Sequence, residues 1–205
     1  MYCSLQKIKT VIYYCVLAGE ASCGKDTSAN ILNSELMRKN VDSVILSLAE
    51  PIKLAVSSTS LNKEDNRPAW QAYGECMRER YGQDYFAKVL CEKAEENYSF
   101  VGDKILIIIP DLRLPEEFNY FKNMENALNI KIFAEEKIRE NRMGKDKWSI
   151  YKEKSQKDKT ETGIGSINET YFDYIIHNNF NRIDKLQYNL ISLIEDKIIG
   201  FMEER

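Results

Sequence analysis

Short apolar runs alternate along the chain with stretches whose apolar residues recur every three or four positions. The apolar runs predict strands at residues 11–18, 43–48, 104–109, 129–134 and 174–176. The three-to-four spacing predicts helices at residues 25–40, 68–80, 84–97 and 181–200, with further helical segments after Pro51 and Pro115. Strands that alternate with helices imply an α/β fold, a doubly wound five-stranded parallel sheet with helices on both faces.

The composition indicates one domain. A chain of 205 residues, 43% of them hydrophobic, can bury a single core. The net charge of −3 argues against a nucleic-acid partner, and no apolar run is long enough to span a membrane. Five scattered cysteines without a CxxC pair suit a reducing compartment such as the cytoplasm, and a single histidine excludes a His-rich metal site. Whether the chain forms a homodimer is left open.

The clearest motif follows the first predicted strand. Gly19 and Gly24 lie five residues apart, Lys25 comes next, and a predicted helix begins there. This is the pattern of a phosphate-binding loop, in which glycines turn the backbone N–H groups inward and the lysine reaches the outer phosphates. A glycine-rich turn without a ligand is the alternative, which the strand–loop–helix context disfavours. The predicted ATP-binding residues of the loop are Gly19, Ala21, Ser22, Cys23, Gly24, Lys25, Asp26 and Thr27.

A second group of candidates follows the second predicted strand. Lys53 lies near the ends of the strands, although Pro51 at a helix start is also ordinary capping. The stretch from Arg67 to Arg78 combines guanidinium groups for phosphate, the amide of Gln71 for base edges and the ring of Trp70 for stacking. For any one of these residues, a surface charge or a core aromatic is an equally good interpretation.

Two further groups lie at the end of the third predicted strand and in the polar stretch. Asp111 follows the most apolar strand, where a magnesium-orienting carboxylate is expected, and Arg113 would project into the same cleft. A helix-entry aspartate is the alternative. Residues 135–168 hold most of the charged surplus and suggest a mobile lid. Arg139 and Arg142 lie three apart there, which suits clamping a phosphoryl group and equally suits a solvated helix face.

Taken in order, these segments resemble the bacteriophage deoxynucleoside monophosphate kinases, members of the P-loop nucleoside monophosphate kinase superfamily. The resemblance runs from about residue 10 to 195 and rests on the phosphate loop, the segment 48–53, the arginines and glutamine of 67–78, Asp111-Leu112-Arg113, and the closing Asp173-Tyr174-Ile175-Ile176-His177-Asn178. In that family the sequence GKDT replaces the commoner GK[ST], so Asp26 supports the resemblance. The lid is longer and richer in lysine here, and the segment after Lys53 is shorter than in the larger phage enzymes.

The resemblance implies a P-loop kinase fold with ATP and Mg²⁺ as cosubstrate and cofactor, a helical nucleotide-binding insertion at about 51–100 and a lid at about 136–166. Lys25 would bridge the β- and γ-phosphates, and Asn178 would lie near adenine. The implied magnesium ligands are Asp26 or Thr27, beside the Asp111 inferred above. The residues that would receive the monophosphate are Lys53, Arg67, Gln71, Arg78 and Arg113, and the lid pair would be Arg139 and Arg142.

We therefore expect transfer of the ATP γ-phosphate to a (d)NMP, with small-molecule nucleotides as substrates, in a host cytoplasm if the chain is phage-encoded. One alternative is a related P-loop kinase for another phosphorylated small molecule, such as phosphomevalonate or dephospho-coenzyme A. The other is a nucleotide-binding regulatory protein without transfer. Converging arginines favour the kinases, because a mere binder does not need them.

Overall fold

The centre of the protein is a five-stranded, all-parallel sheet with the order β2-β3-β1-β4-β5. A computed structural model describes residues 9–56, 63–155, 163–180 and 182–204. The strands are β1 (Val11–Ala18), β2 (Ser43–Ile45), β3 (Lys104–Leu112), β4 (Ala127–Phe133) and β5 (Tyr174–His177). The predicted doubly wound five-stranded sheet is confirmed.

The strand residues explain this order. β1 lies in the middle and is buried at every position after Val11, which suits its continuous apolar run. It pairs with β3 on one side, for example Cys15 with Ile108, and with β4 on the other, for example Cys15 with Leu128. The predicted strand 104–109 is thus an interior strand, and it extends to Leu112, so Asp111 belongs to its last residues.

The second strand is shorter than the predicted 43–48. β2 ends at Ile45, and Leu46 N still donates to Ile108 O at 3.0 Å. After that the backbone leaves the sheet, because Leu48 N and Ala49 N donate to the carboxylate of Asp111 instead of to a neighbouring strand. The fourth strand also differs slightly, since it begins at Ala127 and ends at Phe133.

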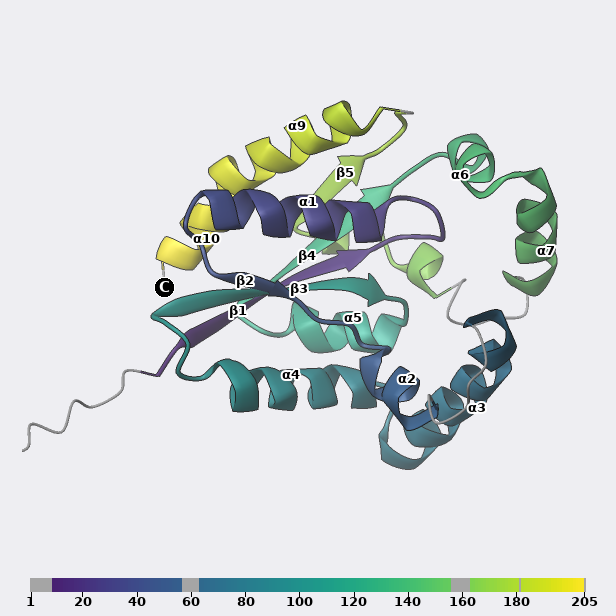
Figure 1. Cartoon of the computed structure of the whole chain (residues 1–205), viewed down its shortest axis with the longest axis horizontal. Coiled ribbons are helices and arrows are strands. Elements are labelled where there is room, and N and C mark those ends of the chain that lie inside the picture. Colours follow the sequence, from purple (N-terminus) through teal and green to yellow (C-terminus); the bar gives the residue numbers. More distant parts are fainter. Residues whose placement is uncertain (1–8, 57–62, 156–162, 181, 205) are drawn as a thin grey trace, which may run out of the picture.

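One face of the sheet is covered by α1 (Lys25–Arg38) and by the C-terminal helices, as Figure 1 shows. The apolar stripe of α1, Ala29, Leu32 and Leu36, packs with Leu190 in one buried cluster. The predicted helix 181–200 is interrupted: α9 (Ile183–Leu193) continues into the π-helical stretch η3 (Ile194–Ile198) and then α10 (Ile199–Glu203).

The opposite face is covered by α4 (Tyr85–Tyr98) and α5 (Pro115–Lys122) (Figure 1). Phe86 and Leu90 of α4 and Phe118 and Phe121 of α5 are buried in the second core cluster. Pro115 is the first residue of α5, a position where its missing N–H costs nothing. Helices therefore lie on both faces of the sheet (Figure 1).

The remaining segments gather beyond the carboxyl ends of the strands. Two helices, α2 (Glu50–Val56) and α3 (Lys63–Tyr81), lie on the α4 side, and α6 (Glu136–Met143) and α7 (Lys145–Ser155) lie across from them (Figure 1). Short 3₁₀ turns η1 (Ile164–Ser166) and η2 (Glu169–Tyr171) lead to β5. Within the described ranges, no helix is both long and apolar enough to cross a membrane.

Candidate active site at the phosphate loop

The loop between β1 and α1 requires glycine at both ends. Gly19 has φ +151°, and a Cβ there would lie 2.3 Å from the carbonyl oxygen of Ile132. Gly24 has φ +105°, and a Cβ there would lie 2.5 Å from Nδ2 of Asn178. These conformations and approaches exclude a side chain. The loop therefore passes close to β4 and β5 and ends on the N-terminus of α1, where backbone N–H groups and the helix dipole favour an anion.

Lys25 folds back over its own loop. Its Nζ donates to Gly19 O at 2.5 Å and to Glu20 O at 3.0 Å. Both acceptors are neutral main-chain carbonyls, so the ammonium group keeps its full positive charge. Because a hydrogen bond from an ammonium to a phosphate oxygen is stronger than one to a neutral carbonyl, bound phosphate can draw Lys25 away from these carbonyls.

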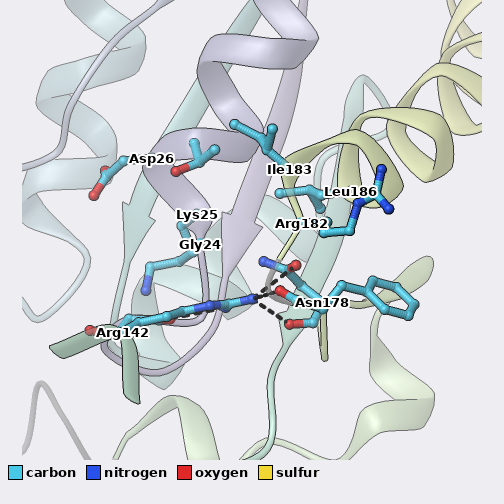
Figure 2. Close-up of a pocket in the computed structure, with 11 residues that line it drawn as sticks. Gly24, Lys25, Asp26, Arg142, Asn178, Arg182, Ile183 and Leu186 are labelled. Atoms are coloured by element: carbon cyan, nitrogen blue, oxygen red, sulfur yellow. Dashed lines mark hydrogen bonds between the residues drawn. The ribbon is translucent and has the colours of Figure 1, made fainter. Parts of the chain in front are cut away.

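Asp26 and Thr27 open α1 beside Lys25, and both are exposed. Figure 2 shows the Asp26 carboxylate directed away from Arg142. No cluster of three or more acidic, histidine or cysteine side chains suited to a metal exists among the described residues. This donor set still fits Mg²⁺, because that ion commonly takes one or two protein oxygens, with phosphate and water as the other ligands.

A cavity of about 430 Å³ lies on the α9 side of the loop. Its apolar wall is formed by Ile183 and Leu186 of α9, and Ile183 is 62% exposed. Its polar wall includes Thr27, Arg142 and Asn178 (Figure 2). An opening next to the phosphate loop, with one apolar and one polar wall, can hold a planar base attached to the phosphates.

Arg142 reaches from α6 into this cavity and ties two loops together. Its Nη1 donates to Ser22 O at 3.3 Å and Cys23 O at 3.2 Å. Its Nη2 donates to Asn178 O at 2.8 Å, Asn178 Oδ1 at 3.2 Å and Phe180 O at 2.7 Å (Figure 2). Partial burial lowers the pKa of Arg142. All these acceptors are neutral, so Arg142, like Lys25, keeps its charge.

Asn178, which was predicted to lie near adenine, lies in the cavity wall, and its amide is already engaged. Its Nδ2 donates to Cys23 O at 2.8 Å, and its Oδ1 accepts from Arg142. Asn178 therefore holds the phosphate loop against the end of β5. Cys23 itself is buried, and burial raises the pKa of its thiol, which suits a small residue filling a tight turn.

Arg139 has a different environment from Arg142 although both come from α6. It is only 6% exposed. Its Nη2 lies 3.0 Å from Oε2 of Glu20, its Nε donates to Ala134 O at 3.1 Å, and its guanidinium carbon lies 5.4 Å from the centre of the Trp148 ring. Arg139 thus contacts both the phosphate loop, through Glu20, and α7, through Trp148. The sequence analysis did not single out Glu20.

Asp111 holds the segment that follows β2. Oδ2 accepts from Ser47 Oγ at 2.7 Å and from Ala49 N at 3.0 Å, and Oδ1 accepts from Leu48 N at 2.9 Å. A carboxylate has about four lone-pair sites, so these bonds leave about one for another ligand. The bonds orient the entry into α2, and a magnesium ion would have to share the carboxylate with them.

Arg78 and Arg113 are brought together by a residue that the sequence analysis missed. Glu117 of α5 is 1% exposed, and its Oε1 lies 3.2 Å from Nη2 of Arg78 in α3. Its Oε2 accepts from the backbone N of Arg113 at 3.3 Å and of Leu114 at 3.2 Å. Burial raises the pKa of Glu117, against the opposing effect of Arg78. The spacing Arg113-x-x-x-Glu117 across a helix start is the signal that could have identified it.

The other predicted acceptor residues are more dispersed. Lys53 of α2 and Gln71 of α3 are exposed. Trp70 is half-buried and packs against the core cluster that contains Phe86 and Leu90 of α4. Its Nε1 has no hydrogen-bond partner among the described residues. Arg67 belongs to α3, but its side chain lies outside the described part of the structure. Glu117 thus links the side chain of Arg78 to the backbone at Arg113, whereas Trp70 packs against the core.

Comparisons with known proteins find structures but no sequence relatives. No protein-family model matches the chain, and no curated protein matches it. The chain is similar to the APS kinase CysC of Mycobacterium tuberculosis in complex with AMPPNP and APS, with a TM-score of 0.56 and 15% identity, covering 91% of this chain and 99% of that one. It is also similar to the shikimate kinase of Acinetobacter baumannii in complex with shikimate, with a TM-score of 0.50 and 14% identity, covering 90% and 94%.

A third similar structure is an uncharacterized protein from Eubacterium ventriosum, with a TM-score of 0.52 and 15% identity, covering 92% of this chain and 100% of that one. At such low identities the likeness shows the fold alone. The fold is that of these kinases, which confirms the predicted fold class. None of the three structures named here is a phage deoxynucleoside monophosphate kinase, so they do not support that finer resemblance.

Proposed function

We propose that the protein is a kinase that transfers the γ-phosphate of ATP to a deoxynucleoside monophosphate. The observation that carries the proposal is the pair of sites flanking one phosphate loop. A cavity suited to a base lies on one side with Lys25 and Arg142, and at the end of β3, a neighbour of β1, Glu117 contacts the side chain of Arg78 and the backbone N of Arg113. Transfer between a donor and an acceptor needs this two-sided arrangement.

On the donor side, Lys25 would exchange its carbonyl partners for the β- and γ-phosphate oxygens. Asp26 and Thr27 would hold Mg²⁺, which supplies neutralisation of charge on the β- and γ-phosphates. Arg142 would give up some of its carbonyl bonds in the same way and bind the triphosphate or its base in the cavity. Arg139 has a carboxylate partner in Glu20, so its release onto a phosphate would require that ion pair to break.

On the acceptor side, Arg113 and Arg78 would bind the monophosphate, with Lys53 and Gln71 closing the site from α2 and α3. The reaction is an in-line transfer without a covalent enzyme intermediate, and the protein contributes position and charge. The predicted lid, 136–166, includes residues 156–162, which lie outside the described residues; its described parts, 136–155 and 163–166, would exclude water from the reacting phosphates. The product would enter a DNA-precursor pool, in the cytoplasm of a phage-infected host cell.

A second candidate is a related kinase for another phosphorylated small molecule. The similarity to an APS kinase and a shikimate kinase supports a small-molecule kinase with another substrate. A regulatory protein that binds ATP without transfer is a third candidate. The paired arginines around Glu117 argue against it, because binding ATP alone would not need them.

The test is a coupled ADP-release assay with ATP and Mg²⁺. The acceptors are the four deoxynucleoside monophosphates, phosphomevalonate and dephospho-coenzyme A. We expect magnesium-dependent turnover with at least one deoxynucleotide. Turnover only with another acceptor would assign the protein to a sister kinase. Tight ATP binding with no turnover of any acceptor would assign it to the regulatory class.

A further inference from the structure

We propose that Glu117 is a positioning residue for the acceptor phosphate and that it acts through Arg78. The inference rests on the proposed function and deepens it, since it assigns a task at the acceptor site to a carboxylate that would not itself touch the substrate. A buried acidic group among arginines meant for phosphate is otherwise unexpected, because its charge repels the ligand.

The burial of Glu117 makes its partners obligatory. Its side chain is 2% exposed and that of Arg78 is 14% exposed. An isolated carboxylate at such a depth would be strongly destabilised, and the pairing with Arg78 together with backbone N–H groups offsets part of that cost. The ion pair is therefore a fixed feature of the fold and not a surface contact that forms and breaks.

The two oxygens of Glu117 act on different elements. Oε1 holds the guanidinium of Arg78, which comes from α3. Oε2 holds the backbone N of Arg113 and Leu114, where β3 turns into α5. One carboxylate thus sets the relative position of two arginines that lie 35 residues apart in the sequence. Both are predicted to bind the same phosphate group.

Other neighbours hold the plane of the Arg78 guanidinium. Its central carbon lies 4.9 Å from the centre of the Phe86 ring, a cation–π distance. A Cβ at Gly74, one turn earlier in α3, would lie 3.1 Å from Nη1 of Arg78, so the glycine leaves room for the group. The buried Nε of Arg78 has no hydrogen-bond partner among the described residues. The contacts with Glu117 and Phe86 fix the plane of the guanidinium.

The charges of Arg78 and Glu117 indicate that Glu117 positions Arg78 and does not itself attract the phosphate. The Arg78–Glu117 pair has a net charge near zero, so Arg78 contributes aimed donors more than attraction. Arg113 is exposed, and Glu117 accepts a hydrogen bond from its backbone N. In this arrangement Arg113 attracts the acceptor phosphate, and Glu117 directs Arg78 to the geometry that a phosphate needs.

The test compares Glu117→Gln with Glu116→Gln. Glu116 is the neighbouring residue on the same helix and is exposed, so it is a matched control. A glutamine at 117 keeps the size but has one acceptor oxygen, so it cannot serve Arg78 and the two backbone N–H groups together. We expect Glu117→Gln to raise the acceptor KM about tenfold or more. The KM for ATP and kcat should stay within about threefold, and Glu116→Gln should change none of the three.

A double-mutant cycle separates positioning from a structural role. If Glu117 acts through Arg78, Glu117→Gln in an Arg78→Ala background should change the acceptor KM less than about twofold. Equal effects of Glu117→Gln in both backgrounds would overturn the inference. So would parallel losses in kcat, ATP binding and thermal stability. Should Glu117→Gln fail to fold, Arg78→Lys keeps the charge that Glu117 needs and loses the planar fork, and it must show the same selective rise in acceptor KM.

Calorimetric titration of the same acceptors keeps the two proposals distinguishable, because it requires no turnover. Wild-type protein that binds a deoxynucleotide without phosphorylating it would remove the proposed function, and the ratio of Kd values for wild type and Glu117→Gln would still decide the inference. Turnover of only phosphomevalonate or dephospho-coenzyme A would also remove the proposed function. The inference about Glu117 could still be tested with that acceptor, because each of the two carries a phosphate. Wild-type protein that neither binds nor phosphorylates any of the acceptors would overturn both.

Discussion

Lys25 and Arg142 on one side of the phosphate loop and Arg78 on the other have different kinds of partner. On the proposed donor side, Lys25 and Arg142 donate to neutral groups, namely main-chain carbonyls, the amide of Asn178 and the sulfur of Cys23, although Arg139 on the same side pairs with Glu20. On the acceptor side, Arg78 pairs with the buried carboxylate of Glu117. A cation held by carbonyls keeps its charge, whereas a cation held by a carboxylate is neutralised but oriented.

The difference matches the ligands that we propose for each side. A triphosphate with Mg²⁺ is large and highly charged, and cations on neutral partners can turn toward it without breaking an ion pair. A monophosphate is small, and in-line transfer requires its oxygen to be placed accurately. The donor side should therefore be sensitive to loss of charge, and the acceptor side to loss of geometry. The following substitutions test this contrast.

The largest effect is expected at Lys25. Lys25→Ala removes the ammonium group that donates to the carbonyls of Gly19 and Glu20 in the loop. Turnover in the ADP-release assay should fall about 10³-fold, because a preorganised charge at the transferring phosphate is lost. Lys39→Ala, at the far end of α1, is the control and should leave turnover unchanged. A loss below tenfold for Lys25→Ala would contradict the assignment of the donor side.

The next effect concerns Asp26. Asp26→Ala should lower turnover about 10²-fold and raise the Mg²⁺ concentration needed for half-maximal activity, because a carboxylate oxygen near the ion is removed. A Mg²⁺ titration of initial rates measures both. Asn30→Ala, exposed one turn further along α1, serves as the control. Unchanged magnesium dependence would make Asp26 only a helix N-terminal residue stabilised by the dipole.

Arg142 tests whether the cavity belongs to the donor. Arg142→Ala should lower kcat/KM for ATP at least about tenfold and leave the acceptor KM within about twofold. Steady-state kinetics with each substrate varied in turn gives both values. A selective rise in acceptor KM would show that Arg142 serves the other side, and the contrast between the sides would then fail. Arg142→Lys keeps the charge and should lie between wild type and alanine.

A smaller effect is expected at Asp111, where geometry should matter more than charge. Asp111→Asn weakens the bonds to residues 47–49 and loosens the entry to α2, so the acceptor KM should rise about fivefold and stability should fall by about 1.5–3 kcal/mol. Ser47→Ala removes one of these bonds and should have a weaker effect. The Mg²⁺ requirement decides between the two roles: no change supports the loop-holding role, and a higher requirement supports the magnesium role expected from the sequence.

The smallest effect is a pH trend at Glu117. Burial raises its pKa, so the folded state binds the proton more tightly than the unfolded state. Its contribution to stability is then fully present below the unfolded value of about 4.3 and is lost as pH rises through the higher folded value. Glu117→Gln has no such group, so its stability relative to wild type should improve from pH 4 to pH 7 in denaturant unfolding. The opposite trend would mean that Arg78 and the backbone N–H groups outweigh burial.

Much of the fold followed from local patterns. The strand at 11–18 and the start of α1 at Lys25 agree with the prediction, because a continuous apolar run and a glycine loop are signals within a few residues of each other. The predicted end of the second strand was wrong. The residues after Ile45 include apolar ones typical of a strand, but the backbone of Leu48 donates to Asp111 instead of to a neighbouring strand. The C-terminal helix was predicted, but its π-helical stretch was not, because the apolar stripe continues through that stretch.

The candidate site divides in the same way. The position of the phosphate loop between a strand and a helix was predictable, because the whole motif lies within the nine consecutive residues 19–27. The environments of Arg139 and Arg142 were not, although they lie three apart on one helix. One is buried against Glu20 and Trp148, and the other reaches into the donor cavity. Their spacing predicts a shared face, but their partners come from β5, α7 and the phosphate loop, which no local pattern brings together.

The sequence by itself thus determined the alternation of strands and helices, the phosphate loop and the presence of arginines near the strand ends, because each depends on residues close in the chain. Only the tertiary structure decided which partner each charge has. Glu117 is an ordinary acidic residue near a helix start in the sequence, and it becomes the link between Arg78 and Arg113 once α3 and α5 pack beside β3. Charge pairing acts over a few ångströms in space, and spacing along the chain does not encode that proximity.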